Sequence, residues 1–375
     1  MTQDGGDAAR PLRVLNIMLG VRSGGLERSV VSFHEALLAG GAEPLSVLSP
    51  GAWARGLFAS GRRVIEVETS ARFSWMAGRT LAAAIADVPF DVVVAHGNRA
   101  LKASFMLAKR APIVAVAHAT NLNLAKHGHR FDAAVLPAWA PERDIKTLDA
   151  STLAGRYGGL LRAAGISDHA TATLPHALRA ADWRQTQPNN PKPLIGALGR
   201  FDRNKGFDLL LAAARVLKDR GRDFNLVIAG ADSHGSVAEL AAVRDSLGLT
   251  DDVSLPGWMS SPAAYLGSLD IFCMPSRRET FGLALLEAMA AGRPVVASRL
   301  ADLADAFVDG REGLFFESEN PTALANALDR LLAENGLRQS MAGHARMRAQ
   351  AFDYAVVGPL YAEVLTRFAA MGART

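Results

Sequence analysis

Residues 271–297 read IFCMPSRRETFGLALLEAMAAGRPVVA. The runs Ile271–Pro275 and Pro294–Ala297 are short and apolar, which is typical of strands that are buried on both faces. Between them, Leu283–Ala291 has the length and the apolar content of a helix. A strand, a helix and a second strand in this order predict a βαβ unit on a parallel sheet.

The same alternation continues on both sides of this segment. The other expected strands are Val14–Leu19, Pro44–Leu48, Val64–Val67, Val92–Ala95, Ile113–Ala117, Leu194–Leu198 and Phe224–Ala229, and the other expected helices are Arg28–Ala39, Trp75–Ala86, Leu209–Leu217, Val237–Leu247 and Ala323–Leu332. Repeated β-α units predict an α/β protein with two doubly wound sheets.

The length of 375 residues favours two domains. The proline-rich stretch Gln185–Pro193 cannot carry a helix or a central strand. We therefore expect an N-terminal domain over 1–185, a linker over 186–193 and a C-terminal domain over 194–352. Residues 353–375 are expected to form a helix that could pack back on the N-terminal domain.

The composition excludes several classes of protein. Hydrophobic residues make up 49% of the chain and charged residues 21%, as in a globular protein with a large core. No apolar run approaches the roughly 20 residues that span a bilayer, and Met1–Arg10 does not resemble a signal peptide. The single cysteine, Cys273, lies in an apolar run and is expected to be a buried, inert thiol. These features predict a cytoplasmic protein.

The charge is uneven along the chain. Residues 1–185 hold 21 Lys and Arg against 15 Asp and Glu, a balance of +6, and the remaining residues hold 20 against 22, a balance of −2, which together give +4. A basic N-terminal half indicates either an anionic partner, such as a lipid headgroup, a phosphorylated glycan or nucleic acid, or simply a solvated arginine-rich surface.

Two loops that follow expected strands could bind phosphate. Gly24 and Gly25 lie between the first strand and its helix, where backbone N–H groups can approach an anion, although a plain tight turn would have the same sequence. After Leu198, Arg200 and Lys205 could converge on a diphosphate, or could be two surface cations beside a helix cap.

Two glutamates stand eight positions apart after the strand Ile271–Pro275. Glu279 precedes a glycine-containing turn, and Glu287 falls on the apolar face of the following helix. A carboxylate on an apolar face needs a partner, which could be a ribose or sugar hydroxyl or a structural salt bridge. Backbone N–H groups around Phe281, Gly282 and Leu283 would face a phosphate.

The segment Pro275–Ala297 resembles the E-x7-E signature of the retaining glycosyltransferases of family four, also described as glycosyl transferases group 1. The Gly24-Gly25 loop, the Arg200 and Lys205 positions and Gly257-Trp258 extend the similarity over nearly the whole chain. The resemblance implies the GT-B fold, in which two Rossmann-like domains face a cleft. It also implies transfer of a sugar from a nucleotide-diphosphate donor with retention and without a metal ion or other cofactor.

The resemblance also implies roles for single residues. Arg200 and Lys205 would hold the donor phosphates, Glu279 would contact the sugar, and Glu287 would take the ribose hydroxyls. The loops at Gly230 and at Trp258-Met259 would line the base. His118, at the end of the strand Ile113–Ala117, would be a catalytic residue beside the transferred sugar, together with Glu279.

The sequence departs from the family pattern at two places. Pro175-His176-Ala177-Leu178 stands where the family usually has Pro-Asn followed by a glycine, and Arg299–Asp305 lacks the common Gly-Gly-x-x-Glu turn. Both departures lie near the expected donor site. They therefore bear on the identity of the donor and on activity.

The resulting functional hypothesis is sugar transfer to a hydroxyl of a glycan or glycolipid acceptor, with a UDP-sugar as first candidate donor and a GDP-sugar as second. The expected setting is cell-envelope polysaccharide or lipopolysaccharide synthesis, peripheral to the inner face of the membrane. One alternative is an inactive relative that binds a nucleotide sugar or scaffolds an assembly complex. A nucleic-acid-binding protein is disfavoured, because the basic half lacks interleaved aromatic residues and any known nucleic-acid module.

Overall fold

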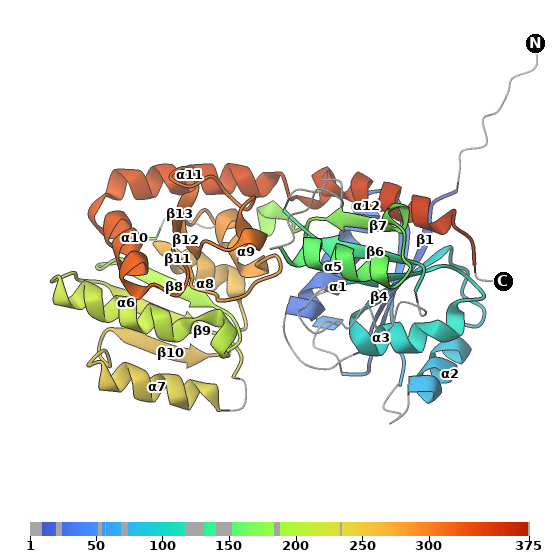
Figure 1. Ribbon diagram of the computed structural model, residues 1–375, viewed down its shortest axis with the longest axis horizontal. Coiled ribbons are helices and arrows are strands. Elements are labelled where there is room, and N and C mark those ends of the chain that lie inside the picture. Colours follow the sequence, from blue (N-terminus) through green and yellow to red (C-terminus); the bar gives the residue numbers. More distant parts are fainter. Residues whose placement is uncertain are drawn as a thin grey trace, which may run out of the picture. The chain divides into compact units, whose positions relative to one another are not determined.

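The computed structural model describes residues 10–19, 25–51, 55–56, 58–68, 74–117, 131–139, 152–183, 188–232 and 235–373. The chain divides into two compact units (Figure 1). Unit 1 comprises Met1–Leu136, Tyr157–Leu174 and Val357–Thr375, and unit 2 comprises Pro137–Arg156 and Pro175–Val356.

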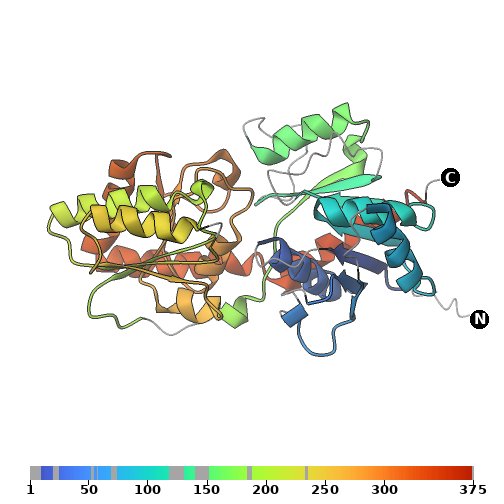
Figure 2. The same ribbon diagram turned by 90° about the horizontal axis from the view of Figure 1, so that it is seen from below.

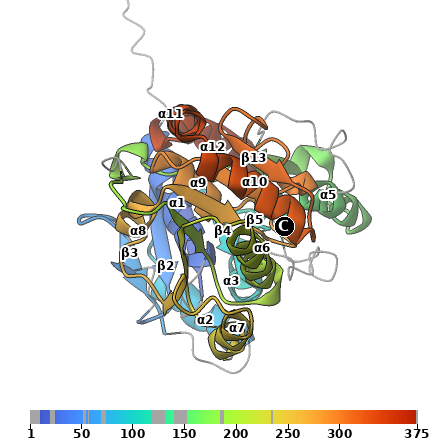
Figure 3. The same cartoon turned by 90° about the vertical axis from the view of Figure 1, so that its left-hand side faces the viewer.

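The described part of unit 1 is built on a seven-stranded sheet with the order β3-β2-β1-β4-β5-β6-β7. Its strands are β1 (Arg13–Met18), β2 (Glu43–Leu48), β3 (Val64–Glu66), β4 (Val92–His96), β5 (Ile113–Val116), β6 (Ala133–Pro137) and β7 (Thr171–Leu174), and its helices are α1 (Gly25–Ala39), α2 (Ser74–Ala84), α3 (Gly97–Ser104), α5 (Leu153–Ala163) and α12 (Tyr354–Ala369). The pairs from β3 through β6 are parallel. Helices α2 and α3 lie next to each other (Figure 3).

Unit 2 is built on a six-stranded parallel sheet with the order β10-β9-β8-β11-β12-β13. Its strands are β8 (Leu194–Leu198), β9 (Asn225–Ala229), β10 (Val253–Gly257), β11 (Ile271–Met274), β12 (Val295–Ser298) and β13 (Gly313–Phe316), and its helices are α6 (Phe207–Asp219), α7 (Ser236–Ser246), α8 (Pro262–Ser268), α9 (Leu283–Ala290), α10 (Pro321–Ala333) and α11 (Asn335–Gln350). Two doubly wound α/β sheets are therefore present, as the sequence predicts.

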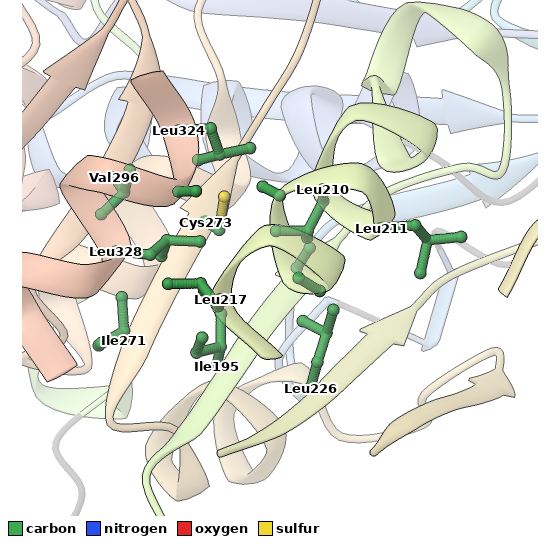
Figure 4. Close-up of a cluster of buried hydrophobic side chains, with 14 of the residues drawn as sticks. Ile195, Leu210, Leu211, Leu217, Leu226, Ile271, Cys273, Val296, Leu324 and Leu328 are labelled. Atoms are coloured by element: carbon green, nitrogen blue, oxygen red, sulfur yellow. The ribbon is translucent and has the colours of Figure 1, made fainter. Parts of the chain in front are cut away.

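Both faces of the unit 2 sheet are covered, which explains its continuous apolar strands. On one face, Ile195 and Leu226 point toward Leu210 of α6 and Leu328 of α10 (Figure 4). On the other face, Phe272 and the other strand residues that point to that side form a second cluster with α8, α9 and α11. Helices α6 and α7 lie side by side, in yellow-green and yellow (Figure 2). Cys273 is buried in the first cluster, as expected, and burial raises its pKa, which disfavours the reactive thiolate.

The boundary between the units differs from the predicted linker. The segment after Leu174 belongs to unit 2, because Leu178 N–H donates to the Phe352 carbonyl at 3.1 Å and the Asp353 carboxylate accepts from Ala180 N–H at 2.8 Å. These bonds hold residues 178–180, which precede the proline-rich stretch, on unit 2.

Most of α12 belongs to unit 1. Gly40, directly after α1, and Gly358 of α12 approach so closely that a Cβ on Gly40 would lie 2.2 Å from the Gly358 carbonyl oxygen. Nearby, the Phe33 and Tyr361 rings meet edge to face at 4.7 Å. No helix among the described residues is both long and apolar enough to cross a membrane.

A buried polar network crosses the core of unit 1. Asn16 of β1 donates to Ser46 Oγ at 2.9 Å, and its Oδ1 lies 2.6 Å from His96 Nε2. His34 of α1 shares the Ser46 hydroxyl through Nδ1 at 2.9 Å. The buried Nε2 of His34 has no hydrogen-bond partner among the described residues. Burial lowers the pKa of His34 to about 4, so the ring is neutral in the folded protein.

Candidate functional site

The strand order of unit 2 places the candidate site. β8 lies between β9 and β11, so the chain leaves β8 on one side and returns on the other. At such a switch point the loops after the two central strands diverge, and their carboxyl ends form a ligand crevice. The loop after β8 holds Arg200 and Lys205, and the loop after β11 holds Glu279 through Gly282. The sequence predicted ligand contacts in both loops.

Lys205 and Glu279 meet directly at this point. Lys205 Nζ lies 2.7 Å from Glu279 Oε2, with the two side chains 24% and 12% exposed. The Ser276 hydroxyl lies 3.4 Å from the same carboxylate oxygen. Because the lysine ammonium has three donor hydrogens, it can hold Glu279 and still donate to an oxygen of a ligand. The pair thus brings a cation and a carboxylate, 74 residues apart in sequence, to one spot.

Arg200 is less firmly held than Lys205. Its side chain is 62% exposed and lies 3.3 Å from Asp202. Asp202 also accepts a hydrogen bond from Asn204 N–H and caps the short turn that ends at Lys205. The structure therefore shows Arg200 as a surface cation on the loop after β8, and its contact with a donor phosphate stays a prediction.

The start of α9 offers backbone donors. Its N-cap is Gly282, which has φ 79°, and no side-chain hydrogen bond caps it in the described structure. The first N–H groups of a helix have no partner within the helix, and the helix dipole favours an anion there. Leu283 begins this helix directly after Phe281 and Gly282, so the predicted phosphate contact falls at a helix N-terminus.

Glu287 lies one turn further along α9 and is 6% exposed. The helix is otherwise apolar, with Leu285, Leu286 and Met289 fully buried. The structure thus confirms a carboxylate on an apolar face, which is costly to bury without hydrogen-bonding partners.

Glycines allow the ends of β8, β9 and β10 to approach one another closely. Gly230 has φ 149°, and a Cβ there would lie 1.6 Å from the Gly199 carbonyl oxygen. Gly230 N–H donates to the Gly257 carbonyl at 2.7 Å. Trp258, which follows Gly257, is 45% exposed, and Met259 is partly buried against the core. The residues predicted to line a base therefore leave from adjacent strand ends.

Arg277 joins the two central loops, a role that the sequence did not reveal. Its guanidinium contacts both oxygens of Asp208 at 2.7 Å and Glu319 at 2.9 Å, and the backbone N–H of Arg277 donates to the Asn204 carbonyl at 2.7 Å. These carboxylates raise the pKa of Arg277, and the bidentate bond lowers the pKa of Asp208. Its partners are distant in sequence, so no local pattern could have indicated them.

His176, the departure noted in the sequence, is a packing residue. It is 5% exposed, and its ring meets Phe281 edge to face at 4.9 Å. Burial lowers its pKa to about 4. At the second departure, Ala301–Leu303 form a short 3-10 turn after β12.

The structure describes little of the site residues predicted in the N-terminal half. His118 and Gly24 lie outside the described residues, and Gly25 is described only as the first residue of α1. Groups of three or more His, Cys, Asp or Glu that could hold a metal ion were not found among the described residues.

Residues 179–348 match the family model for glycosyl transferases group 1. This match covers 170 of the 375 residues, all of them in unit 2. A D-inositol 3-phosphate glycosyltransferase of Arthrobacter sp. strain FB24 is 36% identical over 160 residues, which cover 42% of this chain and 38% of that protein. The match to this relative thus spans well under half of its length.

Other relatives align with this chain over more of its length. A phosphatidyl-myo-inositol mannosyltransferase of Propionibacterium freudenreichii is 29% identical over 364 residues, 90% of each chain. Among solved structures, Anabaena HepE with UDP and glucose has a TM-score of 0.76 at 19% identity, covering 95% of this chain and 99% of that one. A sucrose-phosphate synthase from Thermosynechococcus elongatus has a TM-score of 0.74 at 18% identity, covering 96% and 100%. These structures confirm the GT-B type of fold.

Proposed function

We propose that this protein is a group 1 glycosyltransferase that transfers a sugar from a nucleoside-diphosphate sugar to a hydroxyl of a glycan or glycolipid, with retention and without a metal ion. The observation that carries the proposal is the Lys205–Glu279 pair beside the uncapped start of α9, at the switch point of the unit 2 sheet. Donors for phosphate oxygens and an acceptor for sugar hydroxyls occur together there.

The proposed reaction depends on stabilising the negative charge that forms on the leaving diphosphate. In the transfer step the bond between the anomeric carbon and the diphosphate oxygen breaks, and a bond to the acceptor oxygen forms. Negative charge grows on the leaving diphosphate, where Lys205 and the N–H groups of Gly282 and Leu283 stabilise it. The acceptor proton passes to an oxygen of the departing phosphate on the same face of the sugar. The roles of Glu287 toward the ribose and of His118 toward the sugar remain predictions.

UDP is the first candidate nucleotide and GDP the second. The solved HepE complexes contain UDP and UDP-glucose, which supports a uridine donor for a chain of the same fold. The named acceptor class of the Propionibacterium relative is a phosphatidylinositol, which supports a lipid-linked acceptor in the cell envelope.

Thermal shifts with UDP, GDP, ADP, CMP and their sugar conjugates, in the presence and absence of EDTA, test the proposal. A ligand at 100 times its Kd should stabilise by about 2.7 kcal/mol. We expect a shift with one diphosphate that EDTA does not abolish and that Glu287→Ala removes. No shift with any nucleotide would favour the alternative of an inactive scaffold, and a shift only with divalent metal would contradict metal independence. The anomeric configuration of the product, measured by NMR, tests retention.

A basic and apolar surface on unit 1 supports peripheral membrane binding. Trp75 and Met76 of α2 are 57% and 42% exposed, and Phe105 and Met106, directly after α3, are 43% and 48% exposed. Met106 packs on Gly78 of α2, so these side chains form one surface, which we call the α2 patch.

The charges around the α2 patch are of one sign. Residues 74–84 and 97–110 contain Arg79, Arg99, Lys102, Lys109 and Arg110 and no acidic residue. Aromatic and basic side chains together suit an anionic lipid surface. Among the basic residues of the N-terminal half, for which the sequence left an anionic lipid partner open, Arg62 pairs with Glu35 at 2.7 Å and Arg110 donates to backbone carbonyls. Arg72 lies outside the described residues.

Sedimentation with vesicles tests this part of the proposal. The chain should sediment with vesicles that contain phosphatidylglycerol at low salt and should do so less with neutral vesicles. Trp75→Ser combined with Phe105→Ser should weaken binding, whereas Val356→Ser, at another exposed apolar residue, should not. Equal partitioning of all three proteins would contradict the membrane proposal.

A further inference from the structure

Trp139 packs on the loop between β11 and α9. It lies two residues after β6, is 3% exposed, and its ring stacks on Phe281 with centroids 4.2 Å apart and an interplanar angle of 6°. Phe352 meets the edge of Trp139 at 5.0 Å, and His176 meets Phe281 at 4.9 Å. Phe281 is therefore enclosed by aromatic rings, and Trp139 covers one of its faces.

The polar end of Trp139 makes the decisive contact. Its indole N–H donates to the Phe281 carbonyl oxygen at 2.7 Å in a buried setting. A trans peptide unit is planar, so this carbonyl and the N–H of Gly282 point in opposite directions. Fixing the oxygen toward Trp139 therefore fixes the Gly282 N–H away from it.

This peptide leads into a glycine, which allows it to turn over without a Cβ collision. Gly282 has φ 79° and ψ 59°, and glycine adopts positive and negative φ with similar ease. A turned peptide would aim the Phe281 carbonyl where the Gly282 N–H now points. Beside a bound diphosphate, that change would replace a hydrogen-bond donor by a repelling oxygen.

We propose that Trp139 is a positioning residue that locks the Phe281–Gly282 peptide with its N–H available to the donor phosphate. The inference rests on the proposed function for the role of that N–H, but the lock itself concerns the free protein. Stacking keeps the indole in place, and its hydrogen bond selects one orientation of the peptide. The neighbouring His176, where the family usually has asparagine, completes the aromatic enclosure of Phe281.

Trp139→Phe tests the lock because it keeps a stacking ring and removes the donor. Trp183→Phe is the matched control, since Trp183 is a partly buried tryptophan of the same unit that packs on the same core cluster. The first readout is amide hydrogen exchange in the free protein. Leu285 and Leu286 N–H donate to the Gly282 carbonyl, so this first turn of α9 should exchange at least threefold faster in Trp139→Phe. Trp183→Phe should leave it unchanged.

The second readout is UDP affinity by calorimetry. Loss of one hydrogen bond that orients a ligand contact should raise the Kd about three- to tenfold in Trp139→Phe, with no change in Trp183→Phe. Equal behaviour of the two variants in both readouts would overturn the proposal, as would faster exchange with unchanged affinity.

A third readout uses the unaltered protein and is independent of any loss of stability in the variant. The indole N–H signal that Trp139→Phe removes from the NMR spectrum should exchange slowly with water and should shift when UDP is added. A signal that exchanges rapidly would contradict the hydrogen bond. If the wild-type chain bound no nucleotide, the proposed function would fail, whereas the exchange data would still decide whether Trp139 holds the peptide.

Discussion

The Lys205–Glu279 pair is only partly shielded from water, so its own contribution to stability is small. Exposed ion pairs contribute about 0–1 kcal/mol, and these side chains are 24% and 12% exposed. The pair gains importance if a ligand is present, because Lys205 then bonds an anion away from bulk solvent.

Lys205→Met should therefore weaken nucleotide binding more than it weakens the fold. Hydrogen bonds to charged groups contribute about 1.5–3 kcal/mol, which corresponds to roughly a 10- to 150-fold increase in Kd for the diphosphate. Lys192→Met is the control, since Lys192 also pairs with a carboxylate, Asp223 at 2.8 Å, but lies 47% exposed before β8. Calorimetric titration that gives equal affinities for both variants would remove Lys205 from the site.

His34 should make unit 1 sensitive to acid. Its pKa is about 4 in the folded protein and about 6.5 in an unfolded chain. Between these values the unfolded chain binds a proton that the folded protein does not. Stability is therefore full above about pH 6.5 and falls as the pH drops toward 4, by about 2 kcal/mol at pH 5.

Scanning calorimetry between pH 7.5 and pH 5 measures this loss. His34→Gln should show a smaller decrease for unit 1 than the wild type, and His169→Gln, at an exposed histidine of the same unit, should behave like the wild type. Parallel pH profiles for all three proteins would show that the buried imidazole does not control the acid response.

At the level of elements, the convergence of β8 and β9 depends on Gly230. Gly230→Ala would add a Cβ that lies 1.6 Å from the Gly199 carbonyl oxygen, at φ 149°. The strand ends would have to separate, and we expect unit 2 to lose about 2 kcal/mol or more through strain and collision.

Gly221→Ala separates the effect of backbone strain from that of steric collision. Gly221 also has a positive φ, 75°, but a Cβ there would meet nothing within 4 Å. It should cost only the backbone strain of roughly 1–3 kcal/mol, and it should leave nucleotide binding unchanged, whereas Gly230→Ala should weaken both. Denaturant unfolding and UDP titration of the two variants decide this, and equal losses in both measurements would contradict the role of the close approach.

The elements that the sequence predicts are those with strong apolar patterns. The strand Ile271–Pro275 and the helix Leu283–Ala291 appear as β11 and α9 within one residue. Helix α11 was not predicted as a separate element, because its buried positions Met341, Ala345 and Ala349 are mostly small and its other residues are polar. Hydrophobic periodicity is weak in such a helix.

The candidate site was predictable only in part, for a similar reason. Lys205 and Glu279 could be named because each follows an apolar strand, where parallel sheets place ligands. The contacts of Arg277 with Asp208 and of Trp139 with Phe281 join residues 69 and 142 positions apart. Contacts of this kind depend on the strand order, which a single sequence does not specify.

At the scale of the molecule, the chain crosses between its two units four times. The crossings fall after Leu136, Arg156, Leu174 and Val356. Trp139, His176 and Phe352 lie within a few residues of three of them and contact the aromatic cluster at Phe281. The loop between β11 and α9 therefore packs on residues of unit 2 that lie close in sequence to three of these crossings.

The central claim is that the nucleotide donor binds at the switch point of the unit 2 sheet. The most direct test is hydrogen exchange of the whole chain with and without saturating UDP, or GDP if that is the nucleotide that binds. If the donor binds there, the nucleotide should slow hydrogen exchange in two segments that are separate in sequence, residues 199–206 and 275–290. Lys205→Met should abolish the protection of both segments. Protection elsewhere with none in these segments would contradict this claim.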